Sequence, residues 1–222
     1  MEQKYTRGEV YTVKRLLVYC EGSAEESFVK ELLKPYMLHY GVNVFTRGAG
    51  GISKYSIIRK ELLNHCKSDK NAMITTMLDY YKFPKEAPGM LKKESDLYKK
   101  VKFIESSIEK EMEHPNNLLF NLSIHEFEAY LFSSIEAFHC IASPKQIKML
   151  DAVCKKYDNN PEMINTHYDS IPSRQIIKII PDYQKVFDGI RVAKDVEINN
   201  IITRCTHFAR WISRLTTWAT QK

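Results

Sequence analysis

The sequence predicts an α/β protein with a mainly parallel sheet flanked by helices and a C-terminal helical extension. Two observations carry this prediction. Over residues 1–135, short apolar runs alternate with helical patterns in the order β-α-β-α-β-α-β-α, which is typical of parallel strands joined by helices. Residues 136–222 contain helical patterns and no convincing strand. We therefore expect an α/β core over 1–135 and a basic helical extension over 136–222 that packs on the core.

The core elements are assigned in chain order from apolar periodicity and turn residues. An apolar run over 15–20 predicts the first strand, and the helical pattern after it, from about 24 to 40, ends at Gly41. The stretch 47–53 is glycine-rich and predicts a turn; it lacks the Gly-Lys-Ser/Thr ending of a nucleotide-binding P-loop. The other expected elements are strands over 42–46, 72–79 and 118–124, and helices over about 53–66, over about 91–112 and from residue 125 onward.

The last predicted helix, about 195–219, carries two stripes of side chains. The first is apolar, is expected to pack on the core, and consists of Ile198, Ile201, Cys205, Phe208, Ile212 and Leu215. The second is expected to be free to meet an anion and consists of Arg204, His207, Trp211 and Arg214.

Bulk composition argues against several classes of protein. No apolar run approaches the roughly 20 residues that a membrane-spanning helix needs. The N-terminal segment is polar and has no apolar signal-peptide core. The five cysteines are scattered and none forms a Cys-x-x-Cys pair, which argues against a disulfide framework and against a structural zinc site. A soluble cytoplasmic protein with no membrane partner is expected.

The net charge of +6 is unevenly distributed. Residues 143–222 hold 13 Lys and Arg against 8 Asp and Glu, whereas residues 1–142 hold 20 against 19. A basic C-terminal part suits a polyanionic partner such as DNA or RNA. Ordinary solvated surface explains the same excess, so charge alone leaves both interpretations open.

Acidic residues follow three of the predicted strands. Glu21 ends the first strand and Glu25 lies one helical turn later, Asp79 ends the third, and Glu126 and Glu128 follow the fourth. Because ligands of open α/β sheets bind at the carboxyl ends of the strands, these carboxylates are expected to gather at one functional edge. Each acid also has an ordinary interpretation as a helix-start, turn-forming or solvated first-turn residue.

Several carboxylates in one cleft repel each other, and a divalent cation resolves that conflict. Ligand sets made only of oxygen favour Mg²⁺ or Mn²⁺ over zinc. Such a metal can polarise a phosphate and generate hydroxide from water, which is the chemistry of phosphodiester hydrolysis.

Three of these acids stand in recognisable motifs. Residues 21–28, EGSAEESF, resemble the first motif of Toprim domains, a strand followed by Glu-Gly-x-x-Glu, and Asp79 matches the Toprim aspartate after the third strand. The whole chain resembles the bacterial domain-of-unknown-function family 4276, whose core is Toprim-like. The motifs that carry this resemblance are VYCEGSAEESF, TTMLDYYKFP, IHEFEAYLFS, IPSRQI and RCTHFARWISRL, between residues 18 and 215.

The resemblance implies a fold, a ligand set and a biological setting. In the related overcoming-lysogenisation-defect nucleases, a Toprim glutamate pair and a later helix glutamate bind metals; Glu21 and Glu25 fit the pair and Glu128 fits the later residue. The usual Asp-x-Asp is here Asp79-Tyr80-Tyr81, so the second aspartate is missing, and Glu126 or Glu128 is expected to replace it. A role in bacterial antiphage defence or in mobile elements, beside an ATPase partner, is also implied.

Basic and aromatic residues are candidates to bind substrate. Ser173 could cap a helix with Arg174 near its N-terminus, where phosphate binds well. Lys185, Arg204 and His207 are further candidates to neutralise phosphate; surface charge, or packing for His207, is the alternative. Candidates to stack on bases, with core or loop packing as the alternative, are Tyr80, Tyr81 and Phe83.

These observations together predict a metal-dependent nuclease acting on DNA or RNA. Glu21, Asp79 and Glu128 are expected to bind Mg²⁺ or Mn²⁺, with Glu25 and Glu126 in support. Catalytic charge neutralisation is expected from Arg174, Arg204 and His207. The alternative, prompted by the missing aspartate, is a non-catalytic Toprim-like subunit that binds nucleic acid or a partner protein; a phosphatase or phosphotransferase with a narrow pocket is a third possibility.

Overall fold

The computed structural model describes residues 13–51, 54–164 and 171–221 of the chain. Its five strands form one sheet in the order β2-β1-β3-β4, with β5 pairing β3 beyond β4, and every described pairing is parallel. The predicted α/β class with a mainly parallel sheet is therefore confirmed. The strands are β1 (Lys14–Cys20), β2 (Val42–Gly48), β3 (Ala72–Asp79), β4 (Leu118–Leu119) and β5 (Leu122–Ser123).

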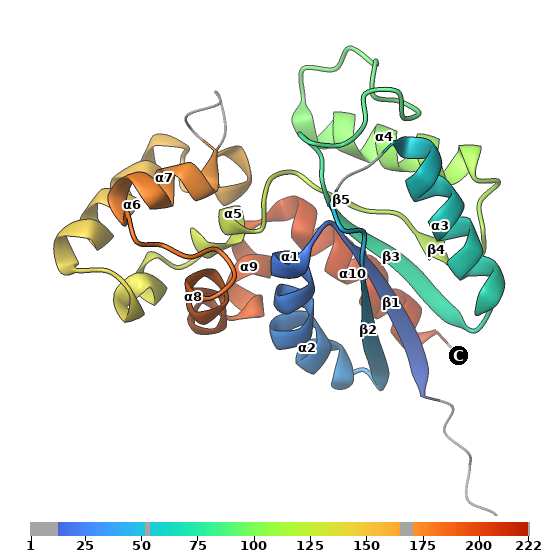
Figure 1. The fold of residues 1–222 in the computed structure, drawn as a ribbon, viewed down its shortest axis with the longest axis horizontal. Helices are drawn as coiled ribbons and strands as arrows, with labels where there is room; N and C mark the ends of the chain where they lie inside the picture. Colours follow the sequence, from blue (N-terminus) through green and yellow to red (C-terminus); the bar gives the residue numbers. More distant parts are fainter. Residues whose placement is uncertain (1–12, 52–53, 165–170, 222) are drawn as a thin grey trace, which may run out of the picture.

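Helices cover both faces of this sheet (Figure 1). One face carries α3 (Tyr55–Ser68) and α4 (Leu97–Glu111), and the other carries α1, α2 and the C-terminal helices. The first helix runs from α1 (Ser23–Phe28) through the π-helical turn η1 (Val29–Leu33) into α2 (Lys34–Leu38). The remaining helices are α5 (Glu128–Leu131), η2 (Ile135–Cys140), α6 (Pro144–Lys156), η3 (Pro161–Met163), α7 (Pro172–Ile179), α8 (Asp188–Val196), α9 (Ile198–Arg204) and α10 (Thr206–Thr220).

Side chains of β1 and β3 divide between two apolar cores, one on each face of the sheet. In β3 all eight residues are buried; Met73 and Met77 enter one core, whereas Ile74 and Leu78 enter the other. This alternation follows from the two-residue period of a strand. The core on the Met73 side also contains residues of α8, α9 and α10, so the C-terminal helices share a core with the sheet.

Several predicted helices are shorter in the structure. The helix expected over 91–112 begins only at Leu97, because the Asp96 side chain accepts a hydrogen bond from the Lys99 N–H and caps it. The helix expected from residue 125 contains only Glu128–Leu131. The helix expected over 195–219 is divided at Glu197, whose φ is 63°, and at Cys205, whose backbone is extended.

The fourth predicted strand, 118–124, is also interrupted. The Thr76 hydroxyl accepts a hydrogen bond from the Asn121 N–H and donates one to the Asn121 carbonyl. The backbone of Asn121 thus bonds to a side chain instead of to the backbone of β3. The ladder of backbone hydrogen bonds is therefore interrupted between β4 and β5. The turn predicted over 47–53 begins later than expected, because β2 extends to Gly48, and residues 52–53 lie outside the described part of the chain.

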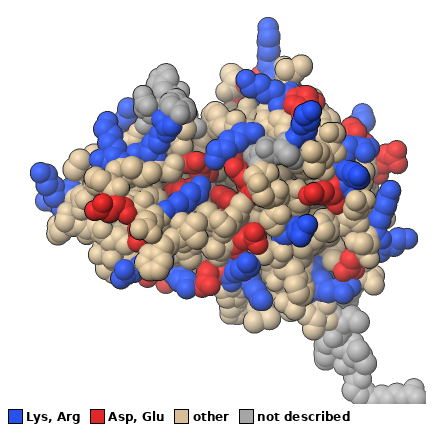
Figure 2. Space-filling view, viewed as in Figure 1, with Lys and Arg blue, Asp and Glu red and all other residues tan. Residues whose placement is uncertain are grey.

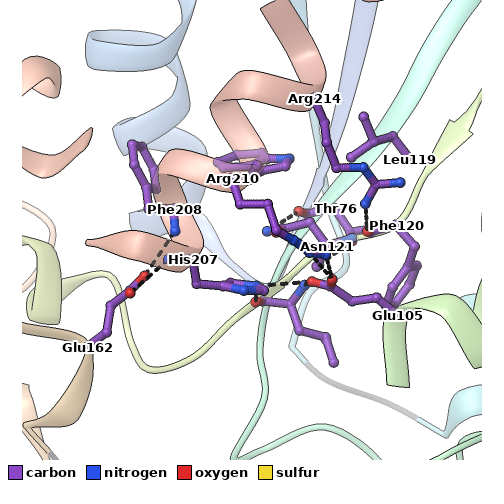
Figure 3. Close-up of polar contacts among 12 residues, drawn as sticks. Thr76, Glu105, Leu119, Phe120, Asn121, Glu162, His207, Phe208, Arg210 and Arg214 are labelled. Carbon is purple, nitrogen blue, oxygen red and sulfur yellow. Dashed lines mark hydrogen bonds and ion pairs between the residues drawn. The ribbon is translucent and has the colours of Figure 1, made fainter. Parts of the chain in front are cut away.

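Two members of the second stripe of the last helix, His207 and Trp211, face the protein interior, which corrects the expectation that this stripe is free to meet an anion; Arg204 is exposed. His207 and Trp211 are buried, and the Trp211 indole N–H donates to the Thr75 hydroxyl. Arg210 and His207 both contact the buried Glu105 of α4 (Figure 3). The apolar stripe does pack on the core as predicted.

Buried polar contacts hold α10 against the rest of the molecule. The Glu162 carboxylate accepts hydrogen bonds from the N–H groups of His207 and Phe208, each at 2.9 Å (Figure 3). A residue of η3 therefore caps the N-terminus of α10, although 45 positions separate it from His207.

Two expectations drawn from composition can be compared with the structure. All five cysteines are free thiols, four of them buried. Within the described ranges, no helix has both the length and the apolar character that crossing a bilayer requires.

Candidate functional site

The acidic residues predicted to meet at the end of the sheet do meet there. Glu21 directly follows β1, and its N–H donates to the Met77 carbonyl of β3. The neighbouring strand ends at Asp79, whose N–H lies 3.3 Å from Glu21 Oε2 and donates to it. Figure 2 shows acidic side chains gathered near the middle of one face of the molecule, with Lys and Arg side chains around them.

Three carboxylates from three strand ends surround one ammonium group. The Nζ atom of Lys82 lies 3.4 Å from Glu21 Oε1, 3.6 Å from Asp79 Oδ2 and 3.2 Å from Glu126 Oε1. Lys82 follows Asp79 in the loop after β3, while Glu126 follows β5. We call the position of this nitrogen the first cation position.

A second lysine joins the two remaining acids. Lys185 Nζ lies 3.0 Å from Glu128 Oε2 and 3.8 Å from Glu25 Oε1. The charge of Lys185 also lowers the pKa of Glu126. We call the position of the Lys185 nitrogen the second cation position. Together the five carboxyl groups of Glu21, Glu25, Asp79, Glu126 and Glu128 form what we call the acidic cluster.

Burial shifts the protonation equilibria of the acidic cluster. Burial raises the pKa of Asp79 to about 7, although Lys82 and the Tyr81 N–H favour the carboxylate. Burial likewise raises the pKa of Glu128 to about 7 against the charge of Lys185. Burial also raises the pKa of Glu25. Carboxylates with raised pKa values at a strand edge are typical of functional sites.

Glu126 has the opposite environment. Burial alone would raise its pKa, but Lys185, the Ser173 hydroxyl and Lys82 outweigh burial and hold the pKa below its usual value. Ser173 donates a hydrogen bond to Glu126 Oε2. The prediction that Ser173 caps a helix is wrong, because α7 begins at Pro172 with Ile171 as its N-cap and has no side-chain cap.

The donor chemistry of the cluster fits a hard divalent cation. All five groups are carboxylates, and against them stand the two ammonium groups of Lys82 and Lys185, so full ionisation leaves an excess of negative charge. Glu128 has no exposed surface, and its Oε1 atom has no hydrogen-bond partner among the described residues. An unsatisfied buried carboxylate oxygen is costly and is a natural cation ligand.

The described residues do not form a ready-made metal site. Within 13–51, 54–164 and 171–221, no three His, Cys, Asp or Glu side chains form, in their present positions, a group that could hold a metal ion. The lysine ammonium groups stand at the points where the carboxylates converge. The acidic cluster thus has the ligands of a divalent ion, but lysine supplies its positive charge.

Comparison with known families agrees with the extent of the motifs in the sequence. The family described as a domain of unknown function, DUF4276, matches residues 20–216. The chain belongs to this family. The matched region spans the acidic cluster and nearly all of the C-terminal helices of this DUF4276 protein. Among curated proteins, none matches the sequence.

Solved structures similar to this DUF4276 protein include two C-terminal regions of OLD proteins. That of Burkholderia pseudomallei is 13% identical, with a TM-score of 0.41, over 91% of this chain and 98% of that chain. That of Xanthomonas campestris pv. campestris is 13% identical, with a TM-score of 0.40, over 95% of this chain and all of that chain.

The three basic residues predicted to neutralise phosphate lie in three different environments. Arg174 lies in the first turn of α7, next to the Ser173 that contacts Glu126. Arg204 is exposed at the end of α9, where its charge acts on the thiols of Cys154 and Cys205. His207 is buried with Glu105 and the Leu122 carbonyl as the partners of its ring. The structure therefore does not bring Arg204 or His207 to the acidic cluster.

The three aromatic candidates for base stacking also separate. Tyr80 and Phe83 are buried in the core that contains α3 and α4. Tyr81 is 50% exposed, and its ring stacks on the imidazole of the buried His125. Burial lowers the pKa of His125 to about 4. Of the three candidates, only Tyr81 can meet a base in solution.

Sequence reasoning missed Lys82 entirely and treated Lys185 as a candidate for phosphate alone. A signal for Lys82 was present, because it lies only three residues after Asp79, directly beyond the predicted strand over 72–79. The structure also places Glu126, rather than Glu128, beside Glu21 and Asp79, while Glu128 pairs with Glu25 around Lys185.

Proposed function

We propose that this DUF4276 protein hydrolyses phosphodiester bonds of DNA or RNA with Mg²⁺ or Mn²⁺. The observation that carries the proposal is the convergence of Glu21, Asp79 and Glu126 on one cation position. These three residues would hold one ion, and Glu25 with Glu128 would supply ligands at the second position. We also propose a cytoplasmic setting, as expected from the composition, and an ATPase partner, which the family resemblance implies.

The roles divide between the metal and the chain. A bound Mg²⁺ or Mn²⁺ ion would polarise the scissile phosphate and lower the pKa of a water molecule. Lys82 and Lys185, both partly exposed, would hold the negative charge of the phosphate. Arg174 would help to orient the substrate from the first turn of α7. Arg204 and His207 have no part in this arrangement.

The test is a cleavage assay of the purified full chain, alone and with a candidate ATPase partner. Single- and double-stranded DNA and RNA are incubated with Mg²⁺, with Mn²⁺ or with EDTA. We expect metal-dependent cleavage that falls by at least about a hundredfold in Asp79→Asn and Glu21→Gln. Glu136→Gln, which changes an exposed acid outside the cluster, is the matched control. The proposal is contradicted if the wild-type protein cleaves none of these substrates, both alone and with the candidate partner.

A second candidate function is supported by the lysines themselves. Because Lys82 and Lys185 already occupy the points where the carboxylates converge, the domain could serve as a non-catalytic subunit that binds nucleic acid or a partner protein. Isothermal titration with Mn²⁺ separates the two functions. Binding that Glu21→Gln and Asp79→Asn abolish supports hydrolysis, and no Mn²⁺ binding by the wild type supports the subunit.

A further inference from the structure

A cavity of about 430 Å³ opens beside the first cation position. Its volume lies within the range of roughly 300–1,000 Å³ that is usual for small-molecule sites. Three of its lining residues, Asp79, Lys82 and Glu126, are the groups of the first cation position. The other lining residues are aromatic or apolar: Tyr81, His125, Ile171 and Pro172.

Tyr81 is held in a fixed orientation within this cavity. Its ring centroid lies 4.9 Å from that of His125 with an interplanar angle of 15°, so one face is covered by the imidazole. The centroid of the Tyr80 ring lies 5.0 Å from that of Tyr81, with an interplanar angle of 71°. The Tyr81 N–H donates a hydrogen bond to Asp79 Oδ1, with a donor–acceptor distance of 2.9 Å. Since the side chain is still 50% exposed, half of its surface remains accessible to a ligand.

The juxtaposition of an exposed aromatic ring and a lysine matches the two parts of a nucleotide. Stacking of a base on an aromatic ring contributes about 1–3 kcal/mol and tolerates any base. A base inside a duplex has both faces covered by its neighbours, so only an unpaired or flipped-out base can reach such a ring. Lys82, whose Nζ is part of the first cation position, can meet the phosphate of the same strand.

We propose that this cavity binds one unpaired nucleobase stacked on Tyr81, which makes single-stranded nucleic acid the substrate class of the acidic cluster. The choice of ligand rests on the proposed function.

The experiment measures binding without turnover. Fluorescence anisotropy in EDTA gives the Kd of the full chain for a labelled single-stranded oligonucleotide and for its duplex. We expect the single strand to bind more tightly. Tyr81→Ala should raise its Kd about tenfold or more, and Tyr81→Phe should leave it within about twofold, because phenylalanine keeps the stacking surface. Duplex affinity should not change in either variant.

A control variant and a spectroscopic signal complete the test. Tyr40→Ala, at an exposed tyrosine after α2, should leave both affinities unchanged. A 2-aminopurine in the single strand should be quenched by the wild type and less by Tyr81→Ala. Equal Kd values for wild type and Tyr81→Ala, tighter binding of the duplex, or no binding of any single strand would overturn the proposal.

The outcome is independent of the cleavage assay. If Tyr81→Ala weakens single-strand binding but the wild type cleaves nothing in Mg²⁺ or Mn²⁺, the proposed hydrolysis is refuted and the base site still stands. In the converse case, the protein cleaves nucleic acid while Tyr81→Ala leaves the Kd for single strands unchanged. That result would refute the base site and leave the proposed hydrolysis standing.

Discussion

The Nζ atom of Lys185 lies 3.0 Å from Oε2 of Glu128, a carboxylate with no exposed surface. Glu128 belongs to the short helix α5 after β5, whereas Lys185 lies between α7 and α8. This contact therefore ties the C-terminal part of the chain to the carboxyl end of the sheet. The free energy of unfolding and the metal affinity are both expected to depend on the charges of the acidic cluster and its two lysines.

Lys185→Met should destabilise the metal-free protein by about 2 kcal/mol or more at pH 8, because it leaves the Glu128 carboxylate buried without its partner. The loss should shrink at pH 5, where Glu128 is protonated. Urea unfolding measures both values. Lys155→Met, at an exposed pair with Asp151, is the control and should change stability by less than about 0.5 kcal/mol. An equal loss at both pH values would contradict this explanation.

Asp79→Asn should stabilise the metal-free protein relative to the wild type at pH 8 but not at pH 4. Burial raises the pKa of Asp79 to about 7, while the pKa of an unfolded aspartate is about 4. Between these values the folded state binds the proton more tightly, so wild-type stability falls as pH rises from about 4 to about 7. Urea unfolding in EDTA across this range tests the sign. Asp151→Asn, at an exposed aspartate, should show no such trend.

Lys82→Met should raise the affinity for Mn²⁺ about tenfold or more, since it removes the ammonium that competes for Glu21, Asp79 and Glu126. Isothermal titration at pH 8 measures the change. Lys99→Met, at an exposed lysine paired with Asp96 on α4, is the matched control. A Kd for Mn²⁺ that stays the same or rises in Lys82→Met would show that the two cations do not share a position.

Glu162→Ala should destabilise the protein by about 2 kcal/mol, because the N–H groups of His207 and Phe208 lose their buried acceptor. The loss should appear in urea unfolding. Glu136→Ala, at an exposed acid of η2, should have little effect. A Glu162→Ala variant with the same free energy of unfolding as the wild type would contradict the view that Glu162 caps α10.

Most of the fold was predictable because strands and turns have local signals. The apolar run that ends at Asp79 and the stop at Gly41, whose φ is +69°, are examples. The interruptions were not predictable, because distant contacts cause them. Thr76 divides the fourth strand through contacts with Asn121, 45 positions away, and the sequence around Asn121 gives no sign of it.

The sequence predicts which acids belong to the acidic cluster, but not which of them lie next to each other. Strand topology brings Glu21 and Asp79 to adjacent strand ends, and no further information is needed for that. Which acid joins them depends on how the chain turns after β5, and this turn selects Glu126. Helical periodicity assigned His207 to an outer face. The C-terminal helices instead cover the sheet, so this face meets Glu105 and is buried.

The most direct test of the account is a crystal of the full chain soaked in Mn²⁺ at pH 8. We predict anomalous density between Glu21, Asp79 and Glu126, with the Lys82 ammonium displaced from its present position. Absence of density, with Lys82 Nζ still in contact with all three carboxylates, would contradict the claim that the acidic cluster binds a divalent cation.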